Sequence, residues 1–175
     1  MRRRWLAGRG DTLPVARGER LLARAVRTDV PAEQQQVVGG TRDALYLPQR
    51  LAWEQVLSAS WDDEAGVLTV VEVAPWGEAT PVHALGLRDA AGLLQLVRER
   101  VQASLVVQRS VPVEPRRSVR IIARRAPAGH GPLAWFVEYD DGLAPDDPAV
   151  AGVVDEAGRR ALEHRGLAGA RMWVA

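Results

Sequence analysis

Alternation of apolar and polar positions marks a series of short strands in the first half of the chain. Val67 to Val73 is the clearest, because it is rich in β-branched residues. Shorter segments with the same character are Val37-Val38, Ala44 to Leu47, Leu51 to Val56 and Pro81 to Leu87, while Leu22 to Val26 fits either a strand or a helix. Turn signals separate them at Gly39 to Asp43, Pro48-Gln49 and Asp62 to Gly66. We expect six or seven short strands in a small barrel or sandwich.

The period of the pattern changes after Asp89. Leu93, Val97, Val101 and Leu105 recur at every fourth position, and polar residues lie mostly on the other side. Asp89 is a suitable N-cap for a helix that starts there and runs to about Val107. This stretch predicts an amphipathic helix of about four to five turns that packs its apolar stripe against the strands.

The C-terminal part has a simpler pattern. Val111 to Arg117 contains two prolines and predicts a connector, whereas Val119 to Arg125 and Leu133 to Tyr139 predict two strands of a hairpin. Asp147 followed by Pro148 predicts the start of a second helix. A ββα unit of this size is too small to stand alone comfortably, so we expect it to pack on the first unit.

Four regions follow from these patterns. Residues 1–17 form a loosely ordered N-terminal arm, residues 18–110 the strands with their helix, residues 111–166 the ββα extension and residues 167–175 a tail. The expected class is mainly β with α, that is, α+β.

Several motifs in the second region resemble bacterial pleckstrin-homology-like (PH-like) domains. They are G-E-R-L-L-A from Gly18, V-V-G-G-T-R-D-A-L-Y-L-P from Val37, R-L-A-W-E-Q-V-L-S-A-S-W-D from Arg50 and G-V-L-T-V-V from Gly66. The resemblance extends from Gly18 to about Val107. It implies seven antiparallel strands in two nearly orthogonal sheets, a split barrel capped by a helix, and a role as an interaction module or scaffold. The ββα extension is not part of that plan.

Composition removes several kinds of chemistry. The chain has no cysteine, which excludes disulfides, zinc–cysteine sites and thiol nucleophiles. All 23 basic residues are arginine, a bias typical of a GC-rich, bacterial genome of actinobacterial type. The net charge of +1 provides no global field for anionic partners. Since there is no signal-peptide pattern and no apolar run of about 18 residues, we expect a cytoplasmic protein without a membrane span.

No group of residues predicts catalysis. The histidines His83, His130 and His164 are far apart and have no carboxylate at metal-ligand spacing. There is no nucleophile elbow and no phosphate-binding loop. An acidic cluster around residues 138–147 could hold a hard cation, but it lacks the EF-hand spacing and Asp147 already has a capping role. We therefore expect no enzyme, no cofactor and no metal.

The loop expected after the first strand argues against phosphoinositide binding. PH-like domains that bind these lipids use basic residues there, whereas T-D-V-P-A-E-Q-Q-Q carries Asp29 and Glu33. We therefore expect no phosphoinositide site.

Two spans of opposite charge suggest partner-binding residues. Residues 98–125 contain eight arginines and two acids, and residues 138–156 contain seven acids and no arginine. The spans can pair with each other inside the fold, or they can form a polar partner surface. The candidate partner-binding residues are Trp76, in a P-W-G loop, and Arg116, Arg117, Arg120 and Arg124.

We expect a non-catalytic module that binds another protein, or a second copy of itself, through an exposed sheet edge or the Trp76 loop. The alternatives are an arginine-rich nucleic-acid-binding protein and an enzyme of unrecognised type. A nucleic acid is less favoured than a protein partner, because the aromatic content is only 5% and no tryptophan lies in the basic span.

Overall fold

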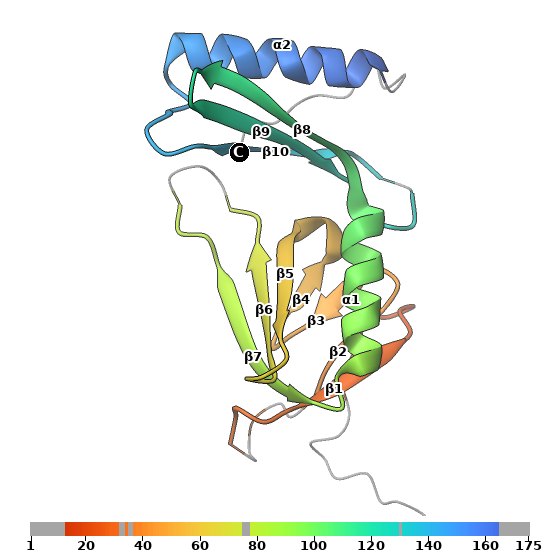
Figure 1. Ribbon diagram of the computed structural model, residues 1–175. Helices are drawn as coiled ribbons and strands as arrows, with labels where there is room; N and C mark the ends of the chain where they lie inside the picture. The colour runs from red at the N-terminus through yellow and green to blue at the C-terminus, as the bar shows by residue number, and fades with distance from the viewer. Residues whose placement is uncertain (1–12, 32–33, 35–36, 75–77, 130, 165–175) are drawn as a thin grey trace, which may run out of the picture.

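The computed structural model describes residues 13–31, 34, 37–74, 78–129 and 131–164. These residues form an α+β structure of antiparallel strands in two sheets with two α-helices (Figure 1). Neither described helix is long and apolar enough to cross a membrane.

The first sheet contains seven strands, within the six or seven that the sequence pattern predicts, although the segment Leu51 to Val56 is divided between two of them. They are β1 (Ala23–Arg27), β2 (Val37–Gly40), β3 (Ala44–Tyr46), β4 (Arg50–Ala52), β5 (Val56–Asp62), β6 (Val67–Glu72) and β7 (Val82–Arg88). Their order is β4-β3-β2-β1-β7-β6-β5, and every neighbouring pair is antiparallel. Because β4 and β5 are the two edges, the sheet is not a closed barrel.

The pair Gly39-Gly40, predicted as part of a turn, lies inside β2 instead. A Cβ on Gly39 would lie 2.7 Å from the Ala23 carbonyl oxygen, and one on Gly40 would lie 2.6 Å from Leu96 Cδ2. The two glycines therefore allow close packing of the strand rather than a reversal of the chain. The reversal itself follows at Thr41 to Asp43, between β2 and β3.

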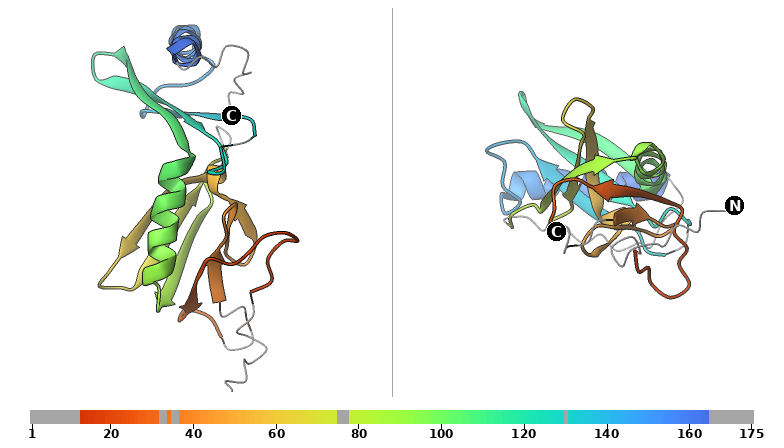
Figure 2. Two further views of the ribbon diagram at one scale, coloured as in Figure 1. Left: turned by 90° about the vertical axis from the view of Figure 1, so that its right-hand side faces the viewer. Right: turned by 90° about the horizontal axis from the view of Figure 1, so that it is seen from below.

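The first helix, α1 (Ala91–Ser104), covers one side of this sheet (Figure 2). Leu93, Leu96 and Val97 are buried in the core between them, as the apolar stripe predicts. The prediction that Asp89 is the N-cap is wrong. Asp89 has a positive φ of 55° and Ala90 is the N-cap, with no side-chain hydrogen bond.

The helix is also shorter than predicted, because the chain becomes a strand at Leu105. This strand, β8 (Leu105–Glu114), begins a three-stranded sheet of order β10-β9-β8 with β9 (Arg117–Arg124) and β10 (Ala134–Tyr139). The connector predicted from residue 111 is therefore mostly strand, and the extension is βββα rather than ββα. Pro112 is compatible with this because β8 is an edge strand, where a missing N–H need not break a ladder.

The second helix, α2 (Pro148–His164), starts as predicted. Asp147 Oδ1 accepts a hydrogen bond of 2.8 Å from the Ala149 N–H, which is a side-chain cap of the first turn. Its buried residues pack on the three-stranded sheet and are Val150, Val154, Ala157 and Ala161. This sheet and α2 lie beyond the C-terminal end of α1, away from the seven-stranded sheet (Figures 1 and 2).

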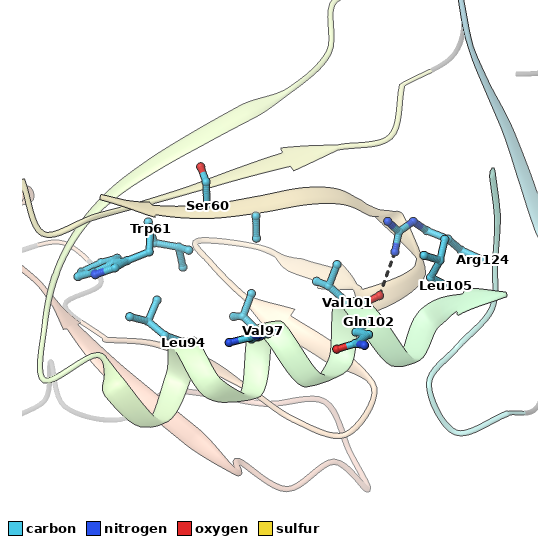
Figure 3. A pocket seen from close by; sticks show the side chains of 11 residues that line it. Ser60, Trp61, Leu94, Val97, Val101, Gln102, Leu105 and Arg124 are labelled. Carbon is cyan, nitrogen blue, oxygen red and sulfur yellow. Dashed lines mark hydrogen bonds between the residues drawn. The ribbon is translucent and has the colours of Figure 1, made fainter. Parts of the chain in front are cut away.

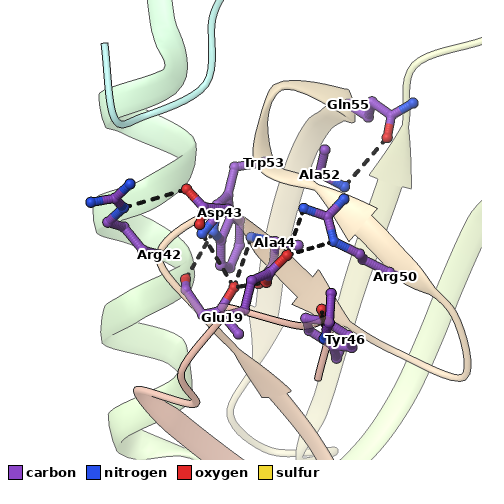
Figure 4. Close-up of polar contacts among 11 residues, drawn as sticks. Glu19, Arg42, Asp43, Ala44, Tyr46, Arg50, Ala52, Trp53 and Gln55 are labelled. Carbon is purple, nitrogen blue, oxygen red and sulfur yellow. Dashed lines mark hydrogen bonds and ion pairs between the residues drawn. The ribbon is translucent and has the colours of Figure 1, made fainter. Parts of the chain in front are cut away.

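A polar corner around the buried Thr41 fixes the turn between β2 and β3 (Figure 4). Thr41 Oγ1 donates to Glu19 at 2.5 Å and accepts from the Ala44 N–H at 3.1 Å, while Arg50 donates to Glu19 at 2.8 Å. Trp53 Nε1 donates to the Thr41 carbonyl at 3.1 Å. Burial raises the pKa of Glu19, but the hydrogen bonds from Thr41 and Arg50 outweigh it and hold that pKa below its usual value. These polar residues therefore have a structural role.

Candidate functional site

The structure does not bring the four candidate arginines together on one surface. Arg116 and Arg117 are exposed at the β8–β9 turn, where Arg117 pairs with Glu114 at 3.2 Å. Arg120 forms an ion pair with Glu138 on the neighbouring strand β10. Arg124 lies at the other end of β9 and is only 5% exposed. The remaining candidate, Trp76, lies outside the described residues.

The two spans of opposite charge meet partly inside the three-stranded sheet. Arg120 stands opposite Glu138 in the β9–β10 register. Asp140 accepts hydrogen bonds from the Ser118 N–H at 2.7 Å and the Ser118 hydroxyl at 3.0 Å, which lower its pKa. Within the described part of the chain, the ion pair of Arg120 with Glu138 thus joins the two spans, whereas Asp140 binds the uncharged Ser118.

The histidines and acids do not assemble a metal centre among the described residues. His83 lies 2.5 Å from Glu72 across neighbouring strands. His130 is not described. The geometry here supports a local pair and no larger cluster.

A groove along β5 lies between α1 and the β5–β6 hairpin and has a volume of about 570 Å³ (Figure 3). Its walls are formed by residues at helical spacing on α1 and by alternate residues of β5. Leu94, Val97 and Val101 project from successive turns of α1, and Ala59 and Trp61 project from the same face of β5. The walls are therefore apolar, and they are only partly covered by the rest of the chain.

The groove follows an open sheet edge. In the described residues β5 pairs with β6 on one side and with no strand on the other. Alternate residues of an edge strand turn their N–H and C=O groups away from the sheet, where another extended segment can pair with them. The edge of β5 thus offers backbone hydrogen bonds directly beside an apolar surface.

Arg124 stands at one end of the groove, while Trp61 lies toward the other end (Figure 3). Its Nη1 donates to Ser104 Oγ at 2.7 Å and to the Val101 carbonyl at 3.1 Å, and its Nη2 donates to the Leu57 carbonyl at 2.8 Å. Its Nε is enclosed without a hydrogen-bond partner among the described residues. Arg124 therefore joins α1 and β5 of the first unit to β9 of the second.

The charge of Arg124 is not balanced within the groove. The described residues that line it include two arginines, Arg98 and Arg124, and no aspartate or glutamate. Burial lowers the pKa of the Arg124 guanidinium, and the more distant Glu138 partly opposes this shift. An arginine pKa starts so far above neutrality that the side chain stays protonated. The groove is thus apolar with a cationic end.

A second groove, of about 630 Å³, lies between β8 and α2. Its charges are mixed, and Arg160 and Arg159 both pair with Glu156 on the exposed side of α2. Glu156 balances part of the charge of Arg109 and Arg160, which line this groove, so it has a weaker claim to an anionic ligand than the groove along β5.

The sequence predicts the residues of the groove along β5 only as core and strand positions. The four-residue repeat places Val97 and Val101 on the buried side of α1, and the alternation in β5 places Ala59 and Trp61 on one face. That β5 is an edge, and that Arg124 reaches across to it, depend on contacts between distant segments.

Comparison with protein-family models, curated proteins and solved structures finds no match for this chain.

Proposed function

We propose that this chain is a non-catalytic PH-like interaction module that binds an extended peptide segment of a partner protein along β5. The observation that carries the proposal is the open edge of β5 beside the apolar groove under α1. Strand addition to a sheet edge is a recurrent mode of peptide recognition. In that mode backbone hydrogen bonds provide affinity and pockets for alternate side chains provide specificity.

The architecture supports the PH-like part of the proposal. Seven antiparallel strands precede one helix, the sheet is open between β4 and β5, and α1 packs over the core. These features agree with the split barrel and capping helix that the sequence resemblance implies. A bacterial origin and a cytoplasmic location stay predictions from composition.

The size and shape of the groove suit a peptide. Its volume falls within the roughly 300–1,000 Å³ of known ligand sites. In an extended peptide every second side chain points the same way, so alternate residues would enter the groove while the others face solvent. The apolar walls favour aliphatic or aromatic residues at those alternate positions.

The nucleic-acid alternative has less support from the geometry. Of the arginines that suggested it, Arg120 is paired with Glu138 and Arg124 is buried. Phosphate binding draws on accessible cationic groups. Arg116 and Arg117 are exposed at the hairpin tip, where Arg117 pairs with Glu114.

A random decapeptide display library, selected on the immobilised full chain, tests the proposal. We expect selected peptides to carry apolar residues at alternate positions and to bind at micromolar concentration in fluorescence polarisation. Val101→Arg places a charged side chain in the groove and should weaken binding at least tenfold. The matched control is Val82→Arg, since Val82 is 58% exposed on β7. Equal affinities for the two variants would contradict the proposed site.

A separate measurement of oligomeric state distinguishes self-association from partner binding. A second copy of the chain could pair its own β5 with this edge. Size-exclusion chromatography with light scattering at increasing concentration would then show a dimer that Val101→Arg abolishes. A monomer at all concentrations is the expected result.

A further inference from the structure

The charge distribution along the groove is asymmetric. Arg124 occupies one end, at the level of the first residues of β5, and Trp61 lies toward the other end, near the last residues of that strand (Figure 3). Three of the five N–H groups of Arg124 donate within the described part of the chain. Among the described residues, no carboxylate lines the groove to balance the charge. An occupant that carries a negative charge at this end would complement it.

The open edge of β5 ends at Arg124. The Leu57 carbonyl, which an added strand could otherwise use, already accepts a hydrogen bond from Arg124 Nη2. Leu105 and Arg124, which line this end, belong to the strands of the second sheet. That sheet lies across the path of a strand added to β5, so a bound peptide stops there instead of running on (Figure 1).

The direction of a bound peptide decides which of its ends meets Arg124. β5 runs from Arg124 toward Trp61, so a parallel peptide would place its N-terminal ammonium beside the guanidinium. Two cations in a poorly solvated site repel each other. An antiparallel peptide would place its C-terminal carboxylate there, and antiparallel pairing is also the commoner arrangement of strands.

We propose that the groove recognises the free C-terminus of a partner protein, whose last residues pair antiparallel with β5 and whose terminal carboxylate lies at Arg124. This inference rests on the proposed function of the groove. Hydrogen bonds between a guanidinium and a carboxylate are stronger than neutral ones, because both groups are charged. The alternate residues before the terminus contact Val101 and Ala59, which favours apolar side chains at those positions.

The test uses two pools of random, N-acetylated hexapeptides that differ only in ending with a carboxylate or with a carboxamide. The full chain is incubated with each pool, and retained peptides are quantified by mass spectrometry after size-exclusion. We expect the carboxylate pool to be retained at least tenfold more strongly, a ratio that corresponds to 1.4 kcal/mol. Since this comparison needs no variant, it does not depend on how a substitution affects folding.

A pair of variants then locates the preference. Arg124→Gln should reduce the ratio between the two pools to near one, because it removes the charge but can still donate hydrogen bonds. Arg120→Gln is the matched control, since Arg120 lies on the same strand but is exposed and outside the groove. It should leave the ratio unchanged.

The outcomes separate the two proposals. Equal retention of both pools, abolished by Val101→Arg, would overturn the carboxylate inference and leave peptide binding in place. Enrichment of aspartate or glutamate near the end of the carboxamide peptides, with no preference for the carboxylate pool, would also overturn it, because a side chain would then supply the charge. No retention of either pool, or retention insensitive to Val101→Arg, would overturn both proposals.

Discussion

The two buried tryptophans of the described core provide a matched test of the polar corner at Thr41. Trp53 is 0% exposed and its Nε1 donates to the Thr41 carbonyl, whereas Trp135 is 2% exposed and its Nε1 has no hydrogen-bond partner in the part of the chain that the structure describes. Replacing each by phenylalanine removes a similar volume of buried ring. Only Trp53→Phe leaves a buried carbonyl without its donor.

The expected magnitudes follow from these two environments. Replacing the indole by the smaller phenyl ring leaves a cavity in either variant. This costs roughly 1 kcal/mol, at about 24 cal/mol per Å³ of cavity that does not refill. The buried Thr41 carbonyl, left without a hydrogen-bond donor, adds about 1–3 kcal/mol to the cost of Trp53→Phe. In Trp135→Phe the lost N–H was itself unsatisfied, so its removal partly offsets the cavity. Trp53→Phe should therefore lower the free energy of unfolding by about 1–3 kcal/mol more than Trp135→Phe.

Urea unfolding followed by far-UV circular dichroism measures this difference. Because the two tryptophans lie in different core clusters, the unfolding of each sheet should also be followed by the fluorescence of the remaining tryptophans. Equal losses of stability for the two variants, or a larger loss for Trp135→Phe, would refute the assignment of the Trp53–Thr41 hydrogen bond as a stabilising contact.

Two further predictions concern the pH dependence of the Glu19 contacts and the N-cap of α2. Glu19 has a lowered pKa in the folded chain, so its contribution to stability is complete above its ordinary value of 4.5 and is lost as the pH falls through the folded value. Glu19→Gln should therefore lower the free energy of unfolding at pH 7 by about 1–2 kcal/mol, and urea titrations should show the two proteins converging toward pH 3; a constant gap would contradict the linkage. Asp147→Ala should cost about 0.5–2 kcal/mol through loss of the α2 cap, whereas Asp146→Ala, one residue earlier, should cost less in the same urea titration. Equal losses would show that the cap contributes nothing.

Local patterns predicted most of the first unit. The alternation in residues 67–73 and the four-residue repeat from Leu93 to Val101 each reflect one buried face, so strand, helix and core position could all be derived from them. Asp147 with Pro148 marked a helix start because both residues act on the first turn alone.

The errors occur where tertiary contacts override local preference. Leu105 continues the helical repeat, yet it starts β8 because its backbone pairs with that of Arg124 on the neighbouring strand β9. Gly39 and Gly40 have the composition of a turn but serve close packing against Ala23 and Leu96. The long strand β8 was hidden by Pro112, a residue that an edge strand tolerates.

The candidate site was predicted only in general terms. An exposed sheet edge was expected to bind a partner, but which strand is the edge depends on the strand order of the whole sheet. Arg124 was selected for its charge and expected to be accessible. Its burial arises because β9 meets the end of α1, a contact that no local pattern records.

The most direct test of the account is the location of a bound peptide by NMR. Backbone amide shifts of the full chain should be recorded with and without a peptide selected from the library. The account predicts that the largest changes, and new protection of amides from exchange, fall on β5 and on the side of α1 that faces it. Changes centred on β4 or on the β8–α2 groove, with β5 unaffected, would contradict it.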